Sequence, residues 1–272
     1  MARPAPDGRG GELRRRIVSA AVLLPAALVA VHLGGWVLAV VVIAAAGMLG
    51  WEWSRLCGFA APRPLGIALI GALALGVTVA HAVSGHAGMA AGFALLGVLA
   101  AFAGPLASHD GGAWRWFGLG LVALGVPCIS FLWLRTVDAN LVFWLLGVTW
   151  AADIGAFFVG RAVGGPRLAP AISPNKTWSG FAGGLAAAAA VGGLFGAAVG
   201  TRGAVVAASA AVLVALAAVV GDLGESALKR RFGAKDAGKL IPGHGGVLDR
   251  VDSLLVAAPA AALLVALGWR WL

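Results

Sequence analysis

Residues 221–252 read GDLGESALKRRFGAKDAGKLIPGHGGVLDRVD and lie between two long apolar runs, residues 203–221 and 252–270. The stretch from Asp222 to Asp252 holds 11 charged residues of both signs. Apolar sequence on both sides indicates a bilayer. Clustered carboxylates suit a divalent metal, and clustered Lys and Arg suit phosphates. The stretch therefore predicts metal-assisted phosphoryl chemistry at a membrane surface.

The composition of the whole chain supports a membrane protein. Of the 272 residues, 61% are hydrophobic and 11% are charged, whereas an ordinary soluble domain carries about 25% charged residues. The mean hydropathy is +0.95. We expect an all-α polytopic membrane protein whose helices pack closely through their abundant Ala and Gly. A net charge of +9 could suggest a nucleic-acid partner. The placement of the charges, in loops beside apolar runs, argues against one.

The apolar runs predict about nine membrane spans, at residues 16–34, 36–53, 65–83, 88–106, 115–133, 141–160, 178–199, 203–221 and 252–270. Cytoplasmic loops are enriched in Lys and Arg. With a cytoplasmic N-terminus, 17 of the 20 Lys and Arg residues fall on the cytoplasmic side, and the exceptions are Arg135, Arg202 and Arg270. The charge distribution therefore predicts a cytoplasmic N-terminus.

The chain divides into two predicted regions. Residues 1–140 are expected to supply about five helices, and residues 141–272 a catalytic membrane region with its site on the cytoplasmic face of the cell membrane. The first two runs could instead form a re-entrant pair. The basic arm over residues 1–16 leads into a helix that we interpret as uncleaved, because further spans follow it. Cys57 and Cys128 lack metal-site spacing and are expected to be free thiols.

Carboxylates from two helix ends are expected to meet at one depth. Span eight ends near Asp222 and span nine begins near Asp252. Asp222, Glu225 or Ser226, and Lys229 share one helical face, as do Asp249 and Asp252. One carboxylate from each helix together with substrate phosphates is a usual Mg²⁺ site. The alternative is two solvated helix ends with local salt bridges, such as Glu225 to Lys229.

A glycine-rich segment, Pro242-Gly243-His244-Gly245-Gly246, lies between these helix ends. Its glycines allow positive φ and close backbone approach, so that successive N–H groups could cradle an anion. His244 could contact a phosphate or nucleotide, or it could only stabilise the turn.

A second candidate site is Ser173-Pro174-Asn175-Lys176-Thr177-Trp178, just before span seven. We expect Ser173 to be an N-cap with Pro174 at the first helical position. Lys176 would then lie in the first turn, where a cation is disfavoured unless a phosphate binds there. The alternative is a lysine that extends to the interface.

A third candidate is Asp153, in the apolar segment LLGVTWAADIGAFFVGR. An acid within an apolar span is costly and is therefore a functional candidate. It could orient Lys176 or Arg161, bind an ion or face a polar cavity, and a purely structural ion pair is the alternative.

These motifs resemble those of the phosphatidate cytidylyltransferases, the CDP-diacylglycerol synthases. SALKRRFGAKDAGKLIPGHGGVLDRVD, residues 226–252, is similar to the family signature, and DIGAFFVGR, GDLGES and SPNKTW resemble its other elements. Ser179 stands where the family usually has an acid, so no acidic role is expected there. The motifs begin at about residue 150, and the first half is similar only as a set of membrane spans.

The resemblance implies transfer of a cytidylyl group from CTP to phosphatidate, which gives CDP-diacylglycerol and diphosphate. It implies Mg²⁺, with room for a second cation, in a bilayer-embedded enzyme; small-residue helices are compatible with a homodimer. The expected catalytic residues are Asp222, Asp249, Lys176 and His244, and the expected metal ligands are Asp222, Asp249 and Asp252. The expected substrate-binding residues are Ser173, Lys176, Thr177, Ser226, Lys229, Arg230, Lys235, Lys239, His244, Gly245, Gly246 and Arg250.

Two other functions are weighed against this one. A CTP-dependent polyprenol or phytol kinase would use the same nucleotide but transfer the γ-phosphoryl group to a lipid alcohol, and the long HGG-to-DRVD signature argues against it. A transporter for anionic solutes would place its charges near the membrane midplane. The charges of this chain gather at one membrane face instead.

Overall fold

The computed structural model describes residues 7–59, 64–83, 85–106, 112–199, 203–241 and 245–269. Within these ranges the side chains of residues 7–17, 20, 64 and 103–106 are not described. The predicted site residue His244, the outer-side cations Arg202 and Arg270, and residues 1–6 of the basic arm therefore lie outside the described residues.

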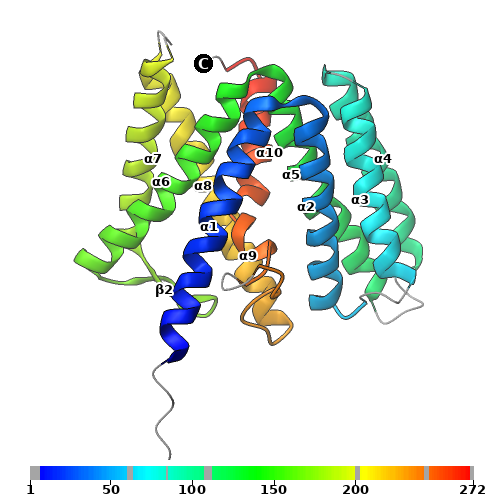
Figure 1. Cartoon of the computed structure of the whole chain (residues 1–272), viewed down its shortest axis with the longest axis horizontal. Helices are drawn as coiled ribbons and strands as arrows, with labels where there is room; N and C mark the ends of the chain where they lie inside the picture. Colours follow the sequence, from blue (N-terminus) through cyan, green and yellow to red (C-terminus); the bar gives the residue numbers. More distant parts are fainter. Residues whose placement is uncertain are drawn as a thin grey trace, which may run out of the picture.

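The described chain forms an up-and-down helical bundle (Figure 1). Its helices are α1 (Asp7–Leu33), α2 (Gly35–Leu56), α3 (Pro64–Ala82), α4 (Gly85–Leu106), α5 (Ala113–Val137), α6 (Ala139–Val163), α7 (Trp178–Ala198), α8 (Ala204–Arg231), α9 (Leu248–Val251) and α10 (Leu254–Ala266). A short antiparallel hairpin, β1 (Arg167–Ala169) with β2 (Ser173–Thr177), joins α6 to α7. The predicted helical class is confirmed, with this hairpin as the addition.

Every predicted span coincides with a helix, and seven helices in the described residues are long and apolar enough to cross a membrane. Of α1, the segment Ala21–Leu33 is a shorter apolar helix. α10 has 13 residues, which corresponds to a length of about 20 Å against a hydrocarbon core of about 30 Å. The helices α1 and α2 are separate and meet at Gly34, and α2 alone is long and apolar enough to cross a membrane, which favours two spans over a re-entrant pair.

The helices near the charged stretch do not end where the predicted spans end. α8 continues beyond the end of span eight near Asp222 to Arg231, which confirms the helical face predicted for Asp222 and Lys229; Gly233, whose φ is 67°, follows the end of the helix. The last long helix does not begin at Asp252: α9 and a turn precede α10, which starts at Leu254. Asp222 therefore lies inside a helix, and Asp252 lies in a turn.

Arg135 links the C-terminal ends of α5 and α1. This residue lies in the last turn of α5, and its side chain donates to the backbone oxygens of Val31 and of His32, the latter at 2.8 Å. These carbonyls belong to the last turn of α1 and lack partners within their own helix. Arg135 thus has a structural role, which accounts for a cation at the end of the bundle opposite the hairpin.

α6 and α7 pack against each other through glycines. A Cβ atom built on Gly180 would lie 2.7 Å from the oxygen of Ala156, and one on Gly184 would lie 2.8 Å from the oxygen of Ala152. Only a residue without a side chain permits this approach, which is the small-residue packing typical of membrane helices. The close contact holds the hairpin, at the N-terminal end of α7, beside the C-terminal half of α6.

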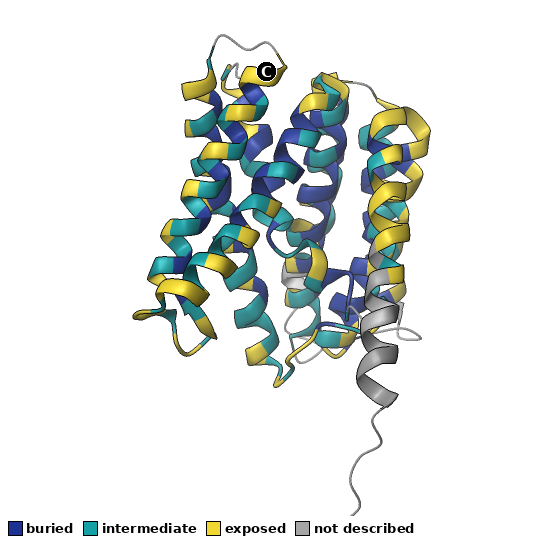
Figure 2. Ribbon diagram, turned by 60° about the vertical axis from the view of Figure 1, so that its left-hand side comes forward, coloured by how far each residue is buried: buried dark blue, intermediate teal, exposed yellow. Residues whose placement is uncertain are grey.

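Buried residues fill the interior of the bundle, and large apolar side chains such as Leu194 and Val205 are exposed on its outside (Figure 2). In water such an apolar exterior would be unfavourable, whereas in a bilayer it contacts lipid. The two cysteines, Cys57 and Cys128, are buried free thiols, as predicted.

We expect Gly184→Val to lower the thermal unfolding temperature of the detergent-solubilised protein, because its Cβ would press on the backbone of α6. Overpacking of this kind costs about 1–3 kcal/mol. Gly71→Val is the matched control, since no atom lies within 4 Å of a Cβ at Gly71. Equal unfolding temperatures for the two variants would contradict the assigned packing.

Candidate functional site

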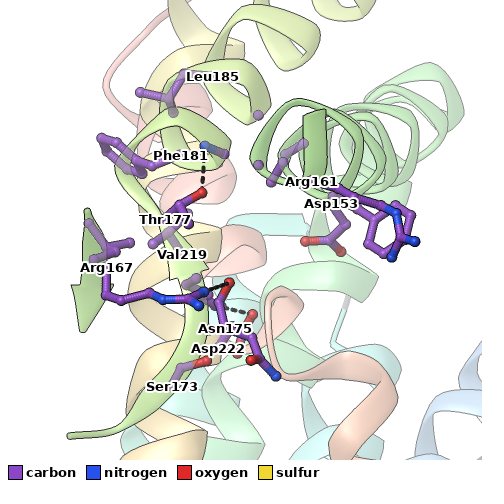
Figure 3. Close-up of a pocket in the computed structure, with 18 of the residues that line it drawn as sticks. Asp153, Arg161, Arg167, Ser173, Asn175, Thr177, Phe181, Leu185, Val219 and Asp222 are labelled. Carbon is purple, nitrogen blue, oxygen red and sulfur yellow. Dashed lines mark hydrogen bonds and ion pairs between the residues drawn. The ribbon is translucent and has the colours of Figure 1, made fainter. Parts of the chain in front are cut away.

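A cavity of about 730 Å³ opens among α6, α7, α8 and the hairpin. Figure 3 shows its polar side chains gathered at one end and Phe181 and Leu185 lining the other. The charged and amide groups that line it are Asp153, Arg161, Arg167, Asn175, Lys176 and Asp222. The cavity thus combines a charged end, suited to phosphates and a cation, with an apolar wall, suited to lipid.

Lys176 and Asp222 form an ion pair across this cavity, from β2 to α8. Their side chains are 28% and 25% exposed, so both remain accessible from the cavity. Ser226 donates to the other Asp222 oxygen over 3.5 Å. Asp153 lines the same cavity, close enough for the charges of Asp222 and Lys176 to act on it. The second and third candidate sites therefore join Asp222 in one place.

The hairpin corrects the predicted N-cap. Ser173 is not an N-cap: residues 173–177 form a strand, and Thr177 caps α7 by accepting from Gly180 N at 3.1 Å. Pro174 tolerates this conformation because its fixed φ also occurs in extended chain. Lys176 therefore projects from a strand just before the helix, and the predicted conflict with the helix dipole does not arise. The hydroxyl of Ser179, in the first turn of α7, donates a hydrogen bond to the backbone oxygen of Gly164, at the end of α6.

A second cluster surrounds Asp249 in α9. Lys229 Nζ lies 2.7 Å from Asp249 Oδ1 and 2.6 Å from Glu225 Oε2. The Glu225–Lys229 salt bridge given above as the alternative thus exists, but Lys229 also joins α8 to α9. Burial alone would raise the pKa of Asp249, yet hydrogen bonds from Lys229 and from the amides of Gly246 and Ala237 outweigh it and hold that pKa below its usual range.

The glycine-rich loop differs from the predicted phosphate cradle. Gly245 has the expected positive φ, 83°. The N–H of Gly246, however, donates to Asp249 Oδ2 at 3.0 Å, and the N–H of Ala237 donates to the same carboxylate at 3.0 Å. These N–H groups therefore bind a protein carboxylate, that of Asp249, which lies three residues after Gly246.

Asp252 lies between the two clusters. It follows α9, and its Oδ1 accepts from Ser253 N at 2.7 Å. Burial raises the pKa of Asp252 to about 6, and the negative charge of Asp222 adds to the rise. A bound cation would relieve this penalty.

The structure does not bring all the predicted site residues together. Among the described residues, no group of three or more His, Cys, Asp or Glu side chains is close enough to hold a metal ion by itself. Substrate oxygens would have to complete any Mg²⁺ site. The remaining predicted cations are exposed beside the two clusters: Arg230, Lys235, Lys239 and Arg250.

Glu52 is a buried acid that the sequence motifs did not indicate. This residue lies near the end of α2 and is 1% exposed, and it contacts the loop before α9. The argument that singled out Asp153, an acid within an apolar span, applies equally to Glu52 in GWEWSRL. The sequence could not indicate which groups donate to the Glu52 side chain, because they lie far away along the chain.

Comparisons with known proteins agree with these motifs. The model of the "Cytidylyltransferase family" matches residues 14–267. A phosphatidate cytidylyltransferase of Pseudomonas aeruginosa is 39% identical over 288 aligned positions, which cover 94% of this chain and 98% of that protein. Those of Brucella suis and Bacillus subtilis are 46% and 38% identical over 156 and 155 positions. For these two, the matched region spans 57% of the relative's length and 56% or 55% of this chain.

We expect Thr177→Val to lower the unfolding temperature, because it leaves the Gly180 N–H without its cap, and loss of an N-cap costs about 1 kcal/mol. Thr177→Ser should retain most of the stability. Ser173→Ala is the control that separates the observed cap from the predicted one. Thermal unfolding in detergent measures all three, and a larger loss in Ser173→Ala than in Thr177→Val would refute the assignment.

Proposed function

The chain belongs to the cytidylyltransferase family, and we propose that it is a phosphatidate cytidylyltransferase, which converts CTP and phosphatidate to CDP-diacylglycerol and diphosphate. The similarity to the Pseudomonas aeruginosa protein over nearly the whole of both chains supports this function. The structural observation that carries the proposal is the cavity in which Lys176 faces Asp222 beside an apolar wall.

In the proposed reaction, a phosphate oxygen of phosphatidate attacks the α-phosphorus of CTP. A new P–O bond forms, the bond between the α-phosphorus and the bridging oxygen breaks, and diphosphate leaves with that electron pair. The attacking oxygen is already ionised, so the protein need not remove a proton. Catalysis then depends on alignment of the two phosphates and on neutralisation of their charge.

Asp222, Asp249 and Asp252 are the proposed ligands of Mg²⁺, with a second cation nearby. Oxygen donors suit this hard cation, and a cation would offset the cost of burying the Asp252 charge, which together with the neighbouring charge of Asp222 raises the pKa of Asp252. Both oxygens of Asp249 already accept hydrogen bonds, so Lys229 is the partner that a cation would displace. Bound Mg²⁺ would neutralise phosphate charge.

The basic residues are proposed to bind the phosphates of the two substrates. Lys176 and Lys229 are the central ones, because each now neutralises a carboxylate that a cation would take over. Arg230, Lys235, Lys239 and Arg250 lie at the exposed rim and would attract CTP. Ser173 and Ser226 would add hydrogen bonds, and His244 would contact the nucleotide. Thr177, Gly245 and Gly246 would shape the site through their backbone contacts.

The proposed site faces the cytoplasm from the inner face of the cell membrane. The hairpin, the end of α8 and α9 lie at one end of the bundle in Figure 1, and their Lys and Arg residues favour the cytoplasmic side. Phe157 and Trp178 are exposed near the cavity, 60% and 54% respectively, where they would contact lipid. Phosphatidate would then enter sideways from the bilayer, and CTP would enter from the cytoplasm.

Homodimer formation is part of the proposal, and the mass of the purified enzyme in detergent tests it.

We expect the purified chain to form a CDP-lipid from phosphatidate, radiolabelled CTP and Mg²⁺. Asp222→Asn and Asp249→Asn should each reduce the initial rate by about 100-fold or more, the scale seen when one electrostatic contact to a reacting group is lost. Asp138→Asn is the matched control, because Asp138 caps α6 at the other end of the bundle and asparagine also caps.

Near-normal rates in both site variants would refute the metal assignment. The same assay with a lipid alcohol in place of phosphatidate tests the kinase, which would release CDP and give a phosphorylated alcohol. Uptake of an anionic solute by proteoliposomes tests the transporter. A protein that forms no CDP-lipid but performs either of these reactions would overturn the proposed function.

A further inference from the structure

A buried carboxylate from the first half of the chain holds the segment that leads into α9, the helix that carries Asp249. Glu52, in the last part of α2, is 1% exposed. Its Oε1 accepts from Val247 N at 3.1 Å, and its Oε2 accepts from Leu248 N at 2.8 Å. These partners are 195 and 196 residues away in sequence. Hydrogen bonds from backbone N–H to a buried carboxylate are among the stronger ones in proteins.

The loop also packs closely around this carboxylate. A Cβ atom on Gly238 would lie 2.2 Å from Glu52 Oε1, and one on Gly246 would lie 2.7 Å from Oε2. Both glycines therefore leave the space that the Glu52 side chain occupies. Packing against Glu52 thus explains why the signature motif has a glycine at position 246, independently of any substrate.

The three consecutive N–H groups of Gly246, Val247 and Leu248 are divided between two carboxylates. The first donates to Asp249 and the other two donate to Glu52. The orientation of the backbone before α9 is therefore determined by Glu52 on one side and by Asp249 on the other. A shift of the Glu52 side chain would turn this backbone and move Asp249 with it.

The position of Glu52 is itself well defined. The adjacent Trp53 is buried, and its Nε1 donates to the oxygen of Trp116 at 2.8 Å. Trp116 lies in the first turn of α5, so the end of α2 is attached to a second helix. Glu52 is thus part of a rigid element, as a group that positions a reactive carboxylate needs to be.

We propose that Glu52 is a positioning residue for the cytidylyl transfer, which acts by holding residues 246–248 so that Asp249 meets Mg²⁺ and the CTP phosphates. This inference rests on the proposed function. It explains why an acid occurs in an otherwise apolar helix, and it gives the N-terminal half of the chain a direct part in the site.

Glu52→Gln tests the inference in the full-length enzyme. Glutamine has the same shape, but it offers one acceptor oxygen and an NH₂ donor where glutamate offers two acceptor oxygens. The NH₂ would face a backbone N–H. We expect kcat to fall by about tenfold to 100-fold, the scale of a misplaced catalytic group, with an unfolding temperature close to that of the wild type. Ser54→Ala is the matched control, since Ser54 is equally buried in α2 but donates only to the nearby oxygen of Trp51.

Hydrogen exchange gives a second readout that needs neither substrate nor metal. The amides of Val247 and Leu248 should exchange at least about tenfold faster in Glu52→Gln, because their acceptor is weakened. Peptides from α6 and α7 should exchange as in the wild type. If the wild type forms no CDP-lipid, the proposed function fails, but faster exchange at residues 247–248 would still support the structural role of Glu52.

Glu52→Asp keeps the experiment decisive if Glu52→Gln does not fold. Aspartate retains the negative charge, but its side chain is shorter by one methylene. We therefore expect a smaller loss of kcat than in Glu52→Gln, and amide exchange at residues 247–248 between that of the wild type and that of Glu52→Gln. Unchanged kcat and unchanged exchange in the folded variant would overturn the inference. An equal loss of kcat in Ser54→Ala would also overturn it, because general packing of α2 would then explain the effect.

Discussion

A charge at the edge of an apolar bundle must be compensated by an opposite charge or by several hydrogen bonds, because an uncompensated buried charge costs several kcal/mol. Three carboxylates in this protein meet that requirement, each in its own way. Asp222 pairs with Lys176, Asp249 accepts from Lys229 and two amides, and Glu52 accepts from two amides. The hairpin, the long α8 and the α9 segment are arranged around these pairs.

The same pairs provide a site for polyphosphate chemistry. A lysine that neutralises a carboxylate in the absence of ligands can transfer its attraction to a phosphate when a cation takes its place. Lys176 and Lys229 both occupy such positions, and they project from different elements toward two carboxylates. Phe181 and Leu185 form an apolar wall of the same cavity that Lys176 lines. The site thus lies where an aqueous nucleotide and a membrane lipid could meet.

Much of the fold followed from apolar runs and from the placement of charge. All nine predicted spans coincide with helices, and within the described part of the chain seven of these helices have the length and apolarity expected of a span. Errors occurred where local patterns were ambiguous. Ser173-Pro174 fits the start of a helix, but pairing of residues 173–177 with the strand at Arg167 overrides that local preference.

The sequence by itself determined the membrane-embedded helical class, the family resemblance and most of the chemically active side chains. Only the tertiary structure decided which partner each charge has. Glu52 meets residues 247 and 248 across almost the whole chain, and Lys176 meets Asp222 from another element. Periodicity and spacing indicate which residues are neighbours within one helix or strand. The contacts of Glu52 and Lys176 join different elements, so they depend on how closely those elements approach each other. That approach depends on small residues such as Gly184 and Gly238, whose effect becomes visible only when the opposing atoms are in place.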